Sequence, residues 1–113
     1  LETCHRNMIR RWVLSLHKII QFCEDKQIQL ILVTTPTWHS YYEHLDKHQL
    51  DQLLSTAKEL DNNHENVFYF NFLKDDRFND NDFKDGDHLS EDGAEKFTKI
   101  LKDSIKHKLD IEL

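Results

Sequence analysis

The stretch that decides the fold runs from residue 29 to residue 36 and reads QLILVTTP. Its continuous apolar run, Ile31 to Val33, predicts a strand over residues 29–35 that is covered on both faces, because a strand with one solvated face alternates apolar and polar residues. Pro36 ends this strand, since proline has no N–H to donate to a sheet. A second run, residues 67–72, is rich in aromatic side chains and is typical of another strand.

Three amphipathic helices are predicted around these strands. Apolar residues recur at helical spacing before the first strand, between the strands and near the end of the chain. Asp46 and Gln49 resemble a capping box that starts the middle helix, and Ser90 is a typical N-cap for the last one. The predicted order is helix, strand, helix, strand, long loop, helix. A crossover of this length between two strands implies that they are parallel.

The composition fits a single α/β domain over residues 1–113. Gly 2 and Pro 1 are too few for a protein built mainly from tight turns and short strands. The net charge of −6 argues against a nucleic-acid partner, because binding phosphates needs clustered Lys and Arg. No apolar run is long enough for a membrane span and no signal peptide is visible, so the residues name no compartment.

The metal-binding residue types form no predicted metal site, and no cofactor is expected. Cys4 and Cys23 lack a metal-binding spacing and fall on one helix, too far apart to bridge, so we expect small buried or half-buried thiols. His44 and His48 are four residues apart, but no third ligand is evident. The acidic run over residues 75–87 fails the EF-hand register, which favours a solvated loop over a calcium site.

Asp85 and His88 are the candidate catalytic residues. They are three residues apart on a turn that contains Gly86 and leads into the last helix. Histidine titrates near neutral pH, and a carboxylate that accepts from one ring nitrogen fixes the tautomer and stabilises the imidazolium. The pair follows the second strand, at the carboxyl edge where open parallel sheets bind ligands. The alternative is an acid-rich surface turn in front of a capped helix.

The block from Asp85 to Gly93, followed by an amphipathic helix, resembles the last sequence block of the SGNH (GDSL-like) hydrolase superfamily. Residues 31–36 resemble the strand of that family that ends in a proline before the penultimate crossover helix. Residues 67–71 stand where the family has its last core strand. The resemblance covers the chain from about residue 29 to the final helix.

This resemblance implies a flavodoxin-like, three-layer fold and a serine hydrolase that acts on esters. It makes His88 the general base and Asp85 its orienting acid. The substrate would be an ester-bearing small molecule or an acylated carbohydrate.

The chain departs from that family in its N-terminal motifs. It has no Gly-Asp-Ser nucleophile motif, no oxyanion-hole glycine and no Gly-x-Asn-Asp block. None of its serines has the sequence context of a nucleophile; they are Ser15, Ser40, Ser55, Ser90 and Ser104. We therefore expect the chain to be the C-terminal half of a larger SGNH-like domain and to be inactive alone.

A second hypothesis makes the chain a non-catalytic interaction module that forms homo-oligomers through an exposed sheet edge. Trp38, Tyr41 and Tyr42 do not decide between the two hypotheses. They could line an acyl or sugar pocket, or they could pack the next helix against the core.

Overall fold

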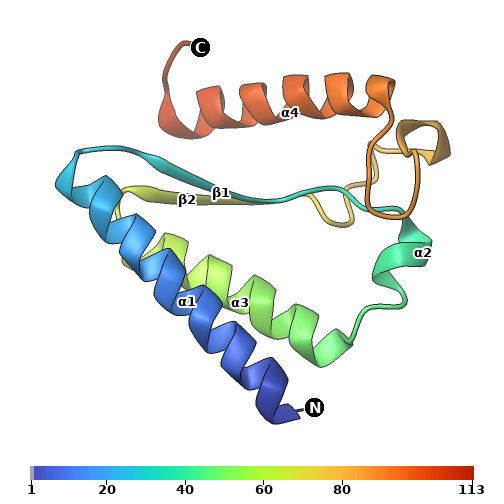
Figure 1. The fold of residues 1–113 in the computed structure, drawn as a ribbon. Helices are drawn as coiled ribbons and strands as arrows, with labels where there is room; N and C mark the ends of the chain where they lie inside the picture. The colour runs from blue at the N-terminus through green and yellow to red at the C-terminus, as the bar shows by residue number, and fades with distance from the viewer. Residues whose placement is uncertain (1) are drawn as a thin grey trace. The chain divides into compact units, whose positions relative to one another are not determined.

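A computed structural model describes residues 2–113 of the chain, with side chains from residue 10 onward. The elements, shown in Figure 1, are α1 (Glu2–Asp25), β1 (Leu30–Thr34), α2 (His39–Tyr42), α3 (Lys47–Asn63), β2 (Val67–Asn71), the 3₁₀ turn η1 (Asp80–Asp82) and α4 (Glu91–Leu109). The mixed helix and strand content confirms the general α/β class. The predicted element order is also confirmed, with the short elements α2 and η1 added to it.

The two strands form a parallel sheet, as the crossover length predicted. Leu30 lies opposite Val67 at one end, and Thr34 lies opposite Asn71 at the other. Both strands end one residue before their predicted ends. Among the described helices, none is long and apolar enough to cross a membrane.

The chain divides into two compact units. The first runs as far as Thr34 and also takes in Asp46–Asn71, so that it holds α1, α3 and both strands. In this unit α1 and α3 pack on the same side of the strands (Figure 1). Its core consists of Ile20, Leu60 and Val67, with Leu16, Leu30 and Leu32 packed against it. Cys23 is buried as expected, and the side chain of Cys4 lies outside the described residues.

The two edges of the sheet differ. On β2 the amide of Tyr69 donates to Asp61 Oδ2 of α3 at 2.8 Å, so a side chain occupies a donor on the outer edge of that strand. Among the described residues, β1 pairs with β2 along one edge and with no strand along the other. An uncovered strand edge is a template for pairing with a further strand. Both strands are therefore edge strands of the described sheet, and one outward amide of β2 is occupied by a side chain.

The second unit consists of the segments that follow the two strands, residues 35–45 and 72–113. Within it, the amide of Thr37 donates to the carbonyl of Leu73 at 3.3 Å, which ties the two segments together. Phe72 packs edge-on against Phe97 of α4, with 5.3 Å between ring centroids. This unit contains both candidate catalytic residues.

Candidate functional site

Asp85 and His88 form a hydrogen-bonded pair on a tight turn in front of α4. Asp85 Oδ1 lies 2.8 Å from His88 Nδ1, and it also accepts from the backbone N–H of His88 at 3.0 Å. Because a carboxylate can only accept, this contact puts the ring proton on Nδ1. The carboxylate thus orients both the ring and the backbone of the histidine, and Nε2 is the nitrogen left for proton transfer.

A second carboxylate, that of Asp87, faces the same ring nitrogen. Its Oδ1 lies 3.0 Å from His88 Nδ1. The hydrogen bond to Asp85, and then the charges of Asp85 and Asp87, raise the pKa of His88. The hydrogen bond from His88 in turn lowers the pKa of Asp85. All three side chains are exposed, and that of His88 retains 68% of its surface, so the pair is open to a group arriving from outside.

A small hairpin shapes the turn that carries the pair. The amides of Lys84 and Asp85 donate to the carbonyl of His88 at 2.9 and 3.4 Å. An antiparallel bridge joins Phe83 to Leu89 at the base of the hairpin. The chain therefore folds back on itself over three residues, which brings the acid against the ring.

The segment around α2 holds this turn from the side. The amide of Trp38 donates to the carbonyl of Gly86 at 3.0 Å. Gly86 lies so close to Tyr41 that an added Cβ would stand 3.2 Å from the Tyr41 Cβ. Trp38 and Tyr41, left open by the sequence, thus position the loop that carries the acid–histidine pair.

Hydrogen bonds and close packing against Asp82 fix the position of the first turn of α4. Ser90 caps the helix by accepting from the amide of Gly93 at 3.1 Å, and its own amide donates to the carbonyl of Asp82 at 2.8 Å. An added Cβ on Gly93 would overlap that carbonyl, so only glycine fits here. The buried carboxylate of Asp82 pairs with Lys96 at 2.6 Å, and this bond lowers the pKa of Asp82.

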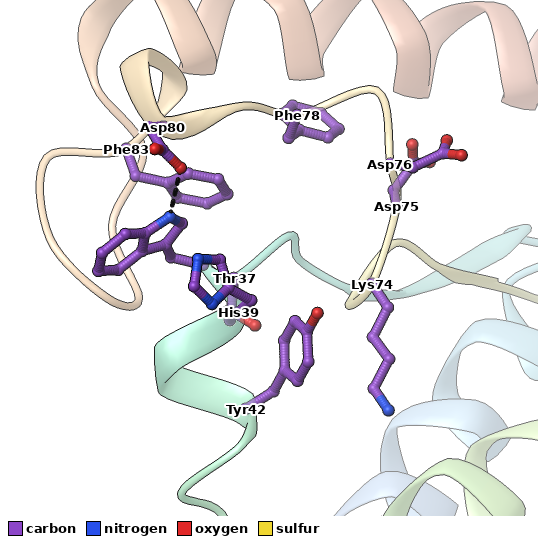
Figure 2. A pocket seen from close by; sticks show the side chains of 10 residues that line it. Thr37, His39, Tyr42, Lys74, Asp75, Asp76, Phe78, Asp80 and Phe83 are labelled. Atoms are coloured by element: carbon purple, nitrogen blue, oxygen red, sulfur yellow. Dashed lines mark hydrogen bonds between the residues drawn. The ribbon is translucent and has the colours of Figure 1, made fainter.

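A cavity of about 270 Å³ lies beside the turn in the same unit, and Figure 2 shows its lining. Its wall combines aromatic rings with ionisable side chains. The lining residues are Thr37, Trp38, His39, Tyr42, Lys74, Asp75, Asp76, Phe78, Asp80 and Phe83. Neither Asp85 nor His88 lines it, but Trp38 belongs both to its wall and to the contact with Gly86.

Four of the serines named above either make hydrogen bonds to groups other than His88 or lie in the first unit. Ser90 donates to the carbonyl of Asn81 at 2.9 Å in addition to its capping role, and Ser104 donates to Ile100 within α4. Ser15 and Ser55 lie in α1 and α3 of the first unit. No serine of the described residues is hydrogen-bonded to His88.

Asp85, Asp87 and His88 also offer one ligand atom each within 4.8 Å of one another, the only such group among the described residues. A protonated Nδ1 between two carboxylates satisfies the same atoms without an ion. The group therefore gives no reason to add a metal to the predicted site.

The fold and this site define a mixed α/β chain with an oriented acid–histidine pair on a loop after a parallel strand. Compared with known families, the chain matches one described as a protein of unknown function (DUF1574) over residues 9–104. The chain belongs to this family, since the match covers most of its length. Neither a curated protein nor a solved structure matched the chain.

Sequence reasoning did not single out Asp87 or the cavity. Asp87 is one acid in an acid-rich run, and nothing in the run distinguishes the acid that faces the ring. The cavity draws its lining from two segments that are more than 30 residues apart, and no spacing pattern links them. The aromatic run after Pro36 was the one signal that pointed to it.

Proposed function

We propose that this chain carries the Asp–His part of the catalytic triad of an SGNH-type serine ester hydrolase. The observation that supports it most directly is the 2.8 Å contact between Asp85 Oδ1 and His88 Nδ1. It is the geometry that a general base needs, because the proton is held on Nδ1 and Nε2 is free to accept another. The motif likeness between residues 85 and 93 and that family supplies the reaction class.

In the proposed reaction, a serine hydroxyl attacks the carbonyl carbon of an ester. His88 Nε2 accepts the hydroxyl proton as the bond to carbon forms, and it then gives the proton to the leaving alkoxide. Asp85 stays ionised and stabilises the imidazolium between these steps. A water molecule then attacks the acyl-serine ester with the same two proton transfers through His88, which frees the serine and releases the carboxylic acid. The serine and the oxyanion donors would come from a preceding half of the domain, so the chain alone would not turn over.

The sheet supports the idea of a larger, flavodoxin-like domain. Every residue of β1 is only half-buried although its centre is apolar, and no strand of the described residues pairs with its outer edge. Parallel strands of this composition are normally covered on both faces and paired on both edges. A preceding half that adds strands beside β1 would pair its outer edge.

Hydrolysis of p-nitrophenyl acetate by the full-length protein tests the proposal. Replacing His88 by Ala should lower kcat by about 10³-fold or more, because the serine loses its base. His107→Ala is the matched control, since His107 is an exposed histidine in the last turn of α4. Equal rates for the parent protein and His88→Ala would refute the assignment of His88.

The second candidate function is an interaction module that oligomerises through its sheet edge. The open edge of β1 favours it, together with exposed apolar side chains on α1, where Leu14 and Phe22 are 62% and 59% exposed. Size-exclusion of the chain discriminates: this function requires a dimer that is lost when Ile31→Lys places a charge in β1. A stable monomer contradicts it.

A further inference from the structure

The cavity next to the acid–histidine turn has a composition that selects its ligand. Four of its lining side chains are aromatic and half-buried: Trp38, Tyr42, Phe78 and Phe83. Around them stand five ionisable side chains, those of His39, Lys74, Asp75, Asp76 and Asp80. Its volume of about 270 Å³ is just below the ~300–1,000 Å³ of typical ligand pockets, which favours a ligand the size of one ring.

The polar wall excludes two classes of ligand. A long acyl chain would press hydrocarbon against charged groups and strip them of water, which costs free energy unless they are paired. Asp75 is already paired with Arg77. A phosphate or another anion would therefore face the carboxylates of Asp76 and Asp80 against the one ammonium of Lys74. Neither a fatty acyl tail nor an anion therefore fits this lining.

An organic cation fits poorly as well, because basic side chains already use the ring faces and the acids. Lys74 Nζ lies 5.0 Å from the centroid of the Tyr42 ring, and His39 lies against Trp38 with 4.7 Å between their centroids. Asp75 is paired with Arg77, and Asp80 accepts from Trp38 Nε1 at 2.7 Å. A bound cation would have to displace one of these partners.

What remains is a flat ligand with an apolar face and a polar rim. The rings of Phe78 and Phe83 lie 6.4 Å apart between centroids, and Lys96 Nζ lies 5.6 Å from the centroid of Phe78, so Phe83 supplies most of the apolar surface. C–H groups are attracted to such ring faces. Tyr42, whose hydroxyl is visible in Figure 2, and Asp76 both belong to the lining of the cavity. They can donate to and accept from hydroxyl groups. A sugar ring combines these two features.

We propose that this cavity binds a sugar ring, which favours the acylated carbohydrate over the other substrate class that the family resemblance implies. The geometric link is Trp38, which lines the cavity with its side chain and holds Gly86 of the catalytic turn with its amide. A sugar on this wall stands beside the loop that carries His88. The binding of a sugar stands on its own, whereas its role as substrate rests on the proposed function.

Nuclear magnetic resonance of the Trp38 indole N–H measures the binding directly. The chain has two tryptophans, so Trp12→Phe assigns the signal. The probes are methyl β-glucopyranoside and N-acetylglucosamine, with tetramethylammonium and hexanoate as comparison ligands. We expect a saturable shift with a sugar at millimolar concentration and none with the comparison ligands. No saturable shift with either sugar, or one only with a comparison ligand, overturns the proposal.

Two variants locate the site. Tyr42→Ala should weaken sugar binding by about tenfold, and Asp76→Asn should weaken it by a smaller factor. Asp92→Asn, at an exposed acid in the first turn of α4, is the matched control and should bind as the parent does. If Tyr42→Ala does not fold, Asp76→Asn decides, because Asp76 is exposed. Unchanged binding by the folded variants places the sugar elsewhere and overturns the assignment.

This outcome is separable from that of the ester hydrolysis test. If the chain binds a sugar but the His88→Ala variant keeps its esterase activity, the proposed function is refuted and the sugar site stands. If His88→Ala loses esterase activity but the chain binds no sugar, the proposed function stands and the sugar site is refuted.

Discussion

His88 Nδ1 lies between two carboxylates, and this arrangement sets its titration. Asp85 provides a hydrogen bond and a charge at 2.8 Å, and Asp87 provides a charge at 3.0 Å. We expect the pKa of His88 to lie above its ordinary value of 6.5, in the direction that both carboxylates favour. Asp85→Asn should lower it, and Asp87→Asn should lower it less. Titration of the ring proton signals measures both effects, with Asp92→Asn as control.

The sign of the pH effect on stability follows from the same contacts. Because the pKa of His88 is raised on folding, its contribution is complete below about 6.5 and is lost as pH rises through the folded value. Because the pKa of Asp85 is lowered, its contribution is present above 3.8 and is lost as pH falls through the folded value. The pair therefore stabilises the turn between these limits. An unchanged His88 midpoint in Asp85→Asn would contradict the hydrogen bond.

The two glycines give a matched pair of substitutions. Gly93 packs against the carbonyl of Asp82, and Gly86 packs against the side chain of Tyr41, which can move. Gly93→Ala should lower the free energy of unfolding by about 1–3 kcal/mol, although alanine is the better helix former. Gly86→Ala should cost less, because only a small shift of Tyr41 is needed. Urea denaturation compares the two, and equal losses would mean that α4 does not depend on the Asp82 contact.

At the scale of elements, α4 is joined to η1 by an ion pair whose carboxylate is buried. The Asp82 side chain is 7% exposed, and Lys96 is its cationic partner at 2.6 Å. Lys96→Met leaves that carboxylate buried without its charge partner, so we expect a loss of about 1–3 kcal/mol at neutral pH. The loss should vanish below the lowered pKa of Asp82, where the carboxyl is protonated in both proteins.

Lys99→Met is the control for this prediction. Lys99 pairs with Glu95 at 3.3 Å on the exposed face of α4, where such pairs contribute at most about 1 kcal/mol. Urea denaturation of both variants at the two pH values separates a buried pair from an exposed one. Equal losses in the two variants would show that burial of Asp82 has no energetic weight.

The elements that the sequence predicted are those with a repeated local signal. The apolar spacing of α3, its cap at Asp46, and the cap of α4 at Ser90 all appear in the structure. α2 and η1 have four and three residues, too few for any period to show. The acid–histidine contact was predictable because three residues of chain bring the two together. The close approach of Gly93 to Asp82, and the cavity, depend on packing between distant segments, which no local pattern encodes.

At the scale of the whole molecule, the two outer edges of the sheet differ in one contact. Asp61 occupies the Tyr69 amide on the β2 side, a device that prevents further pairing there. On the β1 side no strand of the described residues pairs with the sheet, and α1 leaves Leu14 and Phe22 exposed nearby in sequence. Both features are expected if β1 is an inner strand of a larger sheet, and neither is needed by a two-stranded unit that functions alone.

Amide hydrogen exchange tests this asymmetry. In the full-length protein the amides of β1 that face away from β2 should exchange at least about tenfold more slowly than in this chain alone, because a neighbouring strand then accepts from them. The Tyr69 amide should exchange equally in both, since Asp61 is its partner in each. Asp61→Ala should accelerate exchange at Tyr69 in both proteins, which verifies the reference. Equal exchange of β1 in the two proteins would mean that no strand adds at this edge, and it would remove the sheet argument for a preceding catalytic half.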